Sequence, residues 1–134
     1  MGRKKILLVD DSSTARLLER MLLQREYELI EAENGVEGLA KAIAEKPDLI
    51  LLDVVMPEMD GFETCRQLRQ QDATRAIPII MVTTGCEARN VASGFANGCT
   101  DFLAKPIRSV ELFAKIKNCL GEIPVHAGTG ARPR

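Results

Sequence analysis

Short runs of apolar residues alternate along the chain with longer segments in which apolar residues recur at helical spacing. The runs occupy residues 6–9, 49–52, 78–82 and 102–104, and a weaker run at 27–32 has acids between its apolar positions. Short apolar runs bounded by polar or turn residues predict strands, and an unbroken run such as 49–52 is typical of a strand buried on both faces. The pattern therefore predicts five strands.

The segments between the runs predict helices, which begin at residues that can cap a helix. Ser12 and Ser13 can cap the first, Asn34 to Glu37 resembles a capping box, and Ser109 is expected to cap the last. Residues 90–97 can also be helical, although Ser93 and Gly94 weaken that prediction. The apolar positions are Leu17, Leu18, Met21 and Leu22; Val36, Leu39, Ala40 and Ile43, expected to face inward; Phe62, Cys65 and Leu68; and Leu112, Phe113, Ile116 and Leu120.

This alternation predicts an α/β fold, a doubly wound five-stranded parallel sheet with helices on both faces. A length of 134 residues corresponds to one domain, which we place at residues 4–121. Residues 122–134 contain Pro124, Gly128, Gly130 and Pro133 without apolar periodicity, so we expect a flexible tail or linker there.

Composition narrows the function classes. A net charge of −1 gives no bulk attraction to nucleic acid or to anionic membranes. No apolar stretch approaches the roughly 18 residues that a membrane span requires, and no signal-peptide pattern precedes the first strand. The four cysteines, at positions 65, 86, 99 and 119, include no C-x-x-C pair, so we expect free thiols in a cytoplasmic protein.

Polar residues follow four of the predicted strands. Asp10 and Asp11 follow the first, Asp53 ends the third, and Thr83 and Lys105 end the fourth and fifth. Because ligand sites of parallel sheets lie at the carboxyl ends of the strands, we expect these side chains to converge, with Asp53 as the reactive residue. Each residue alone is better explained as a strand end, a helix cap, a turn former or a surface charge. All of them being inert at one sheet edge is improbable.

These residues resemble those of the receiver domain of response regulators, the CheY-like family of two-component phosphorelay systems. The matching motifs are residues 9–12, the segment from Asp53 to Gly61, Thr83, and Lys105-Pro106. The resemblance covers nearly all of residues 4–120. It implies a flavodoxin-like sheet in the order 2-1-3-4-5 and phosphorylation of Asp53 by a sensor histidine kinase or histidine phosphotransfer protein. A downstream protein target or an appended output domain would then respond.

The chemistry of three adjacent acids agrees with this resemblance. Mutual repulsion raises at least one pKa, and a divalent cation such as Mg²⁺ removes that penalty. We expect direct coordination by Asp11 and Asp53 and a water-mediated contact from Asp10; the resemblance adds the backbone carbonyl of Val55. Lys105 would place a positive charge, and Thr83 a hydroxyl, against phosphoryl oxygens. The only chemistry expected is the protein's own phosphorylation and dephosphorylation.

Some features leave alternatives open. The apolar Val55 cannot orient an attacking water, and Thr84 stands where the family usually has a smaller residue, so both bear on how long the phosphorylated state lasts. Phe102 is either a switch residue, working with Thr83, or plain core. A phosphate-independent pseudo-receiver and a phosphatase of the haloacid-dehalogenase type are the other functions; the latter would require an aspartate at position 55. His126, in the tail, is expected to be inert.

Overall fold

Five parallel strands form the centre of the molecule, in the order β2-β1-β3-β4-β5. They are β1 (Lys5–Val9), β2 (Glu28–Ala32), β3 (Leu49–Asp53), β4 (Ile79–Thr83) and β5 (Asp101–Ala104). The order and the parallel pairing confirm the predicted doubly wound sheet. This computed structural model describes residues 2–84 and 88–122, so the predicted tail, apart from Glu122, lies outside the described residues, as do Cys86 and His126.

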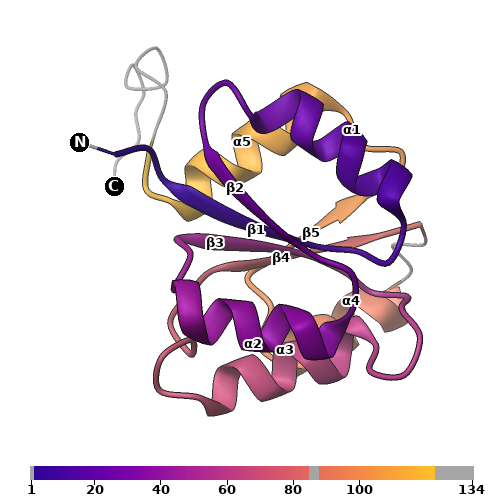
Figure 1. Ribbon diagram of the computed structural model, residues 1–134. Coiled ribbons are helices and arrows are strands. Elements are labelled where there is room, and N and C mark those ends of the chain that lie inside the picture. The colour runs from indigo at the N-terminus through magenta and orange to yellow at the C-terminus, as the bar shows by residue number, and fades with distance from the viewer. Residues whose placement is uncertain (1, 85–87, 123–134) are drawn as a thin grey trace.

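Helices cover both faces of the sheet (Figure 1). On one face lie α1 (Ser13–Leu23) and α5 (Ser109–Cys119); on the other lie α2 (Gly35–Glu45), α3 (Gly61–Gln70) and α4 (Ala88–Ala96). Alternate residues of each strand enter different cores, so Leu7 and Ile50 belong to one and Ile6 and Leu51 to the other. All five residues of β3 are buried, which explains its unbroken apolar run.

The orientation predicted for α2 is wrong for three of its four apolar residues; the fourth, Leu39, does pack against the core. Val36 and Ile43 are 57% and 37% exposed, Ala40 is also exposed, and Leu39 is only partly buried. The residues that face the sheet are instead Gly35, Gly38 and Ala42. Gly38 lies against Val9 of β1, where there is little room for a larger side chain. Small residues therefore let α2 pack closely on the sheet, and the side chains of Val36 and Ile43 are turned outward.

Helix α1 also exposes apolar side chains. Leu17, Leu18 and Met21, whose spacing predicts the helix correctly, are 43%, 57% and 60% exposed. Its buried residues are Glu19 and Leu23, four positions apart and hence on one face of the helix. An acidic residue therefore occupies an inward position of α1.

The predicted helix caps are confirmed at two of three helices. The Ser12 hydroxyl accepts a hydrogen bond from the Ala15 backbone N–H, and the Asn34 side chain accepts one from the Glu37 N–H. Ser109, however, is the first helical residue of α5; Arg108 precedes it with extended backbone angles and makes no side-chain capping bond. The Ser109 cap prediction is thus wrong by one position.

Two predictions about environment can be compared with the structure. Among the described residues, no helix is both long and apolar enough to cross a bilayer. The three described cysteines, Cys65, Cys99 and Cys119, are free thiols.

Candidate functional site

The register of the sheet brings the predicted site residues to one edge. Val9 of β1 pairs with Leu52 of β3, so Asp10 and Asp53, the next residue on each strand, lie next to each other. On the far side, Thr83 pairs with Ala104, and the Lys105 N–H donates to the Thr83 carbonyl at 2.8 Å. Four segments that are far apart in the sequence therefore end side by side.

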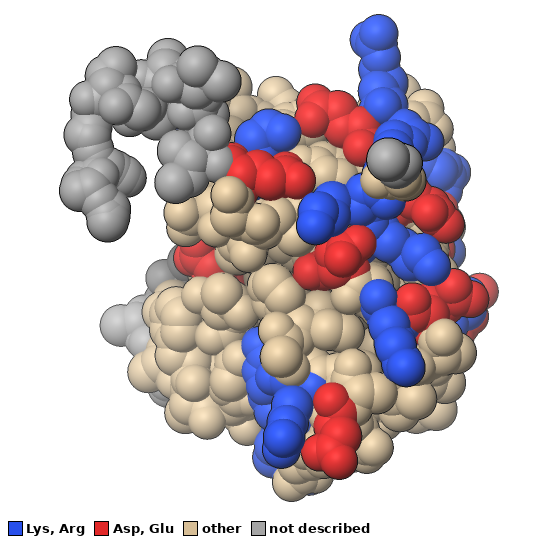
Figure 2. Space-filling view, turned by 90° about the vertical axis from the view of Figure 1, so that its left-hand side faces the viewer, with Lys and Arg blue, Asp and Glu red and all other residues tan. Residues whose placement is uncertain are grey.

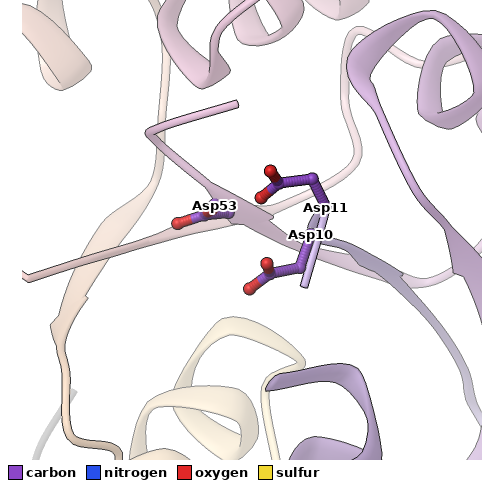
Figure 3. A group of neighbouring side chains, drawn as sticks. All are labelled: Asp10, Asp11 and Asp53. Atoms are coloured by element: carbon purple, nitrogen blue, oxygen red, sulfur yellow. The ribbon is translucent and has the colours of Figure 1, made fainter. Parts of the chain in front are cut away.

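Asp10, Asp11 and Asp53 form an acidic cluster, in which one carboxylate oxygen of each residue lies within 4.8 Å of the others. Figure 3 shows their side chains extending in the same direction from the ends of β1 and β3. Asp10 and Asp53 are only 1% and 6% exposed, whereas Asp11 is exposed to solvent. The cluster is thus partly buried and open on the Asp11 side.

Both carboxylate oxygens of Asp10 already have partners. Oδ1 accepts the Ser12 backbone N–H at 2.9 Å, and Oδ2 accepts from the Lys105 ammonium at 3.3 Å. Arg16 in α1 holds the same residue through its backbone, donating to the Asp10 carbonyl at 2.5 Å. These contacts fix Asp10 firmly and leave Asp11 the more available ligand.

Lys105 links two members of the cluster. Its ammonium lies 3.3 Å from Asp10 Oδ2 and 3.4 Å from Asp53 Oδ1. Burial alone would lower the pKa of this lysine, but the charges of Asp10 and Asp53 and the hydrogen bonds with them outweigh it and raise the pKa. The side chain therefore stays cationic and is 25% exposed, so it retains room to move.

Asp53 has an unusually high pKa, raised from 3.8 to about 6. Burial is the largest cause, followed by repulsion from Asp10, while Lys105 acts in the opposite direction. The single positive charge of Lys105 therefore does not offset the effects of burial and of the neighbouring carboxylates on the pKa of Asp53. A cation bound there would favour the ionised, nucleophilic form of Asp53.

Glycine at position 61 allows the segment after Asp53 to fold back closely. A Cβ there would lie 2.3 Å from the Asp53 carbonyl oxygen and 2.7 Å from Val54 Cα, and the Gly61 N–H donates to the Val54 carbonyl at 2.8 Å. The α3 helix therefore starts directly against the end of β3. Beside it lies a pocket of ≈ 490 Å³ that includes Val55 and Thr83 in its lining. The Val55 side chain is 70% exposed there.

Thr83 and Phe102, the predicted switch pair, are both buried, at 3% and 7% exposure. The Phe102 ring packs on α4 where Gly94 has no side chain: a Cβ at Gly94 would lie 2.3 Å from the ring. Phe95 lies across it, with ring centroids 5.7 Å apart. Phe102 is therefore packed inward, against α4, in this structure.

The cluster suits a magnesium ion. Its donors are all carboxylate oxygens, which hard cations prefer. Ligand oxygens on opposite sides of Mg²⁺ lie roughly 4.2 Å apart, twice the usual bond length, so a cluster spanning up to 4.8 Å fits a mixture of direct and water-mediated contacts. The Val55 carbonyl as a further ligand stays a prediction.

Glu19, an acid near this site, was not predicted from the sequence. It is 2% exposed, and its pKa is raised to about 8 by burial first and by the charge of Asp10 second. The available signal was its spacing: Glu19 is four residues before Leu23, so a buried Leu23 places Glu19 on the inward face of α1.

Comparisons with known proteins agree with this geometry. Residues 6–117 match the family described as response regulator receiver domain. Over 117 residues the chain is 47% identical to the transcriptional regulatory protein ResD of Bacillus subtilis, covering 87% of this chain and 48% of ResD. It is 41% identical to protein PilH of Pseudomonas aeruginosa, covering 87% of this chain and 97% of PilH. The chain thus spans about half the length of one relative and nearly all of another.

Solved structures are similar in fold. The chemotaxis protein CheY4 of Vibrio cholerae superimposes with a TM-score of 0.85 at 37% identity, covering 89% of this chain and all of that one. The receiver domain of sensor histidine kinase PA1611 from Pseudomonas aeruginosa gives a TM-score of 0.84 at 27% identity, covering 90% of this chain and 99% of that one. The PA1611 structure has a magnesium ion coordinated in its active-site cleft.

Proposed function

The chain belongs to the response regulator receiver domain family of two-component systems, and we propose that it is a switch phosphorylated on Asp53. The donor is the phosphohistidine of a sensor histidine kinase or histidine phosphotransfer protein. The observation that carries this proposal is the convergence of Asp10, Asp11 and Asp53 with Lys105 at the carboxyl edge of the sheet. Buried carboxylates with too few positive charges to balance them cost stability, so they are not expected at a sheet edge without a function.

The transfer asks little covalent chemistry of the protein. A carboxylate oxygen of Asp53 attacks phosphorus, and the bond between phosphorus and the donor nitrogen breaks, leaving its electron pair on the imidazole. Lys105, 3.4 Å from Asp53, can follow the new phosphoryl group and pair with one of its oxygens. Thr83, buried beside them at the end of β4, offers a hydroxyl to another.

Asp10, Asp11 and Asp53 would hold Mg²⁺, which when bound neutralises charge on the carboxylates and the phosphoryl oxygens. Asp10, whose oxygens already accept from Ser12 and Lys105, serves best through water. Asp11 is the exposed member and suits direct coordination.

The signal is read on the face formed by α4, β5 and α5. The phosphoryl group adds charge and acceptor oxygens that attract Thr83, and Phe102 on the neighbouring strand packs against α4 through Gly94. A shift of Thr83 would change how firmly that ring is held, and so alter α4. A partner that prefers the altered face would in turn favour phosphorylation. That partner is a downstream protein or an appended output domain.

Acetyl phosphate with Mg²⁺ tests the assignment without a cognate kinase. We expect the intact protein to gain one phosphoryl group, seen by mass spectrometry, and the Asp53→Asn variant to gain none. NMR spectra with beryllofluoride, a phosphoryl mimic, should show shifts that spread from Asp53 through Thr83 to Phe102 and residues 91–97.

Glu45→Gln is the matched control, because Glu45 is an exposed acid at the opposite edge of the sheet. It should be labelled like the parent. Labelling of Asp53→Asn at the parent stoichiometry would refute Asp53 as the acceptor. A parent that binds no Mg²⁺ and accepts no phosphoryl group would identify a pseudo-receiver instead.

A further inference from the structure

Glu19 is a buried carboxyl, one oxygen of which has no hydrogen-bond partner among the described residues. Its side chain is 2% exposed, and within the described part of the chain Oε1 is buried and unpaired. By contrast, the buried hydroxyls of Thr64 and Thr74 donate to the backbone carbonyls of Asp60 and Leu68. An unpaired buried polar group costs stability, and a partner that it gains in another state of the protein would explain why it is kept.

The surroundings of Glu19 point to Lys105 as that partner. The two side chains line one pocket of ≈ 490 Å³, whose other lining residues are apolar except for backbone groups: Ala15, Leu18, Met21, Leu22, Pro106 and Ile107. Lys105 is the only basic residue of that lining. Its charge stabilises the ionised form of Glu19, whereas Asp10, Asp53 and Glu31 oppose it. Lys105 thus pairs with two carboxylates of the acidic cluster and also lines the pocket that contains the unpaired carboxyl of Glu19.

A divalent cation would disturb the present position of Lys105. The ammonium lies within 3.4 Å of Asp10 Oδ2 and Asp53 Oδ1, two carboxylates of the cluster. A cation held there competes for the same carboxylates and repels the ammonium. A partly buried lysine that loses its counter-ions needs another acceptor, and its four-carbon stem allows the ammonium to swing.

We propose that Glu19 is a positioning residue that gives the Lys105 ammonium a second anchoring position when a divalent cation occupies the acidic cluster. Lys105 is then held beside the site, ready to return to a phosphoryl oxygen, instead of being released into solvent. This role rests on the proposed magnesium site but requires no phosphorylation.

Side-chain NMR of Lys105 tests the movement directly. We would titrate the parent, Glu19→Gln and Glu19→Leu with Mg²⁺, using Lys105→Met to assign the ¹³Cε and ¹⁵Nζ signals. In the parent, Mg²⁺ should move these signals to a second, distinct position. In Glu19→Leu they should move to the values of a solvent-exposed lysine, and Glu19→Gln, which retains an acceptor oxygen, should lie between the two.

Calorimetry gives an independent measurement. Glu19→Leu should weaken Mg²⁺ binding by roughly three- to tenfold, a coupling expected of groups that share a partner. In the Lys105→Met background the same substitution should change the affinity by less than about 1.5-fold, within ordinary additivity. Glu45→Gln, which removes a carboxylate at the other edge of the sheet, should leave the affinity unchanged.

Each contrary result has a defined meaning. Equal weakening in both backgrounds would show that Glu19 acts on the cation through its charge alone, and would overturn the proposal. Lys105 signals that respond identically in parent and Glu19→Leu would also overturn it. If acetyl phosphate failed to label Asp53 while Mg²⁺ still moved the Lys105 signals to a second position in the parent but to solvent-exposed values in Glu19→Leu, the proposed function would be rejected and this role of Glu19 supported.

Discussion

The edge of the sheet at which the strands begin and the edge at which they end differ in how their charged side chains are paired and buried. Figure 2 views the edge at which the strands begin, where basic and acidic side chains are interspersed. Most of these charges have individual partners. Lys5 pairs with Glu45 at 3.2 Å, Lys117 pairs with Glu26 at 3.2 Å, and Asp48 accepts the Lys5 backbone N–H at 2.7 Å. These groups are at least partly exposed, so water also solvates them.

At the edge where the strands end, the acids of the site outnumber its one lysine, and all of them except Asp11 are buried. Asp10, Asp53 and Glu19 are all at most 6% exposed, and within residues 2–84 and 88–122 Lys105 is the one cation that pairs with the first two. The pKa values of Asp53 and Glu19 are raised to about 6 and about 8. Paired, solvated charges support the fold, while unbalanced buried charges cost stability and are retained at functional sites. The comparison can be tested by removing one acid at a time.

The largest effect is expected at the open side of the cluster. Asp11→Ala should weaken Mg²⁺ binding by more than about tenfold, because it removes a direct ligand. Asp10→Ala should weaken binding less, since both oxygens of Asp10 are engaged by Ser12 and Lys105. Calorimetric titration measures both. Equal losses would contradict the ranking of the two ligands.

Replacing Glu19 is expected to stabilise the protein, whereas most substitutions destabilise a protein. Its folded-state pKa lies above the ordinary value of 4.5, so in the metal-free protein the penalty from Glu19 is absent below pH 4.5 and grows as the pH rises to about 8. Glu19→Leu should therefore stabilise the protein by about 4 kcal/mol at pH 8 and hardly at all by this cause at pH 4.

Asp53→Asn should show the same sign over a lower range. The pKa of Asp53 rises from 3.8 to about 6, so its destabilising effect develops between these values. A gain of about 3 kcal/mol is expected at pH 7. Urea unfolding with a chelator present, at pH 4, 7 and 8, measures both variants. Gains that do not depend on pH would show that packing, not charge, causes them.

Sequence reasoning succeeded where local chemistry determines the outcome. The run 49–52 ends at Asp53 in both prediction and structure, and parallel pairing then requires Asp10 and Lys105 to lie near it. It failed where packing between elements decides which side of a helix faces inward. The apolar Val36 is exposed because Gly38 brings α2 close to Val9, and the acidic Glu19 is buried because α1 turns that face to the sheet. A hydrophobicity pattern does not contain these rotations.

A loss of stability, smaller in size than the gains expected at Glu19 and Asp53, is expected on replacing Gly94 of α4, which packs against Phe102 of β5. A Cβ there would lie 2.3 Å from the Phe102 ring, so Gly94→Ala should force the ring to move and destabilise the protein by about 1–2 kcal/mol. Aromatic NMR signals of Phe102 and urea unfolding would detect this. An unchanged ring position would mean that α4 yields instead, and that Gly94 does not control the proposed switch. Gly2→Ala, at a site with nothing within 4 Å, is the control.

The smallest effect is expected at the opposite edge, on the Lys5–Glu45 ion pair. The two side chains are 26% and 49% exposed, and pairs of this kind contribute about 0.2–1 kcal/mol because water and salt screen them. Glu45→Ala should therefore reduce stability by about 0.5 kcal/mol or less at pH 7, and by still less at high salt. Its effect should not follow the pH dependence of Glu19→Leu, and Mg²⁺ affinity should stay at the parent value. Urea unfolding at two salt concentrations, together with a Mg²⁺ titration, gives these quantities. Stabilisation of the protein by removal of Glu45, or a change in Mg²⁺ binding, would show that unbalanced charge is not confined to the carboxyl ends of the strands. The contrast between the two ends of the sheet would then no longer support a separate function for the acids at the carboxyl ends.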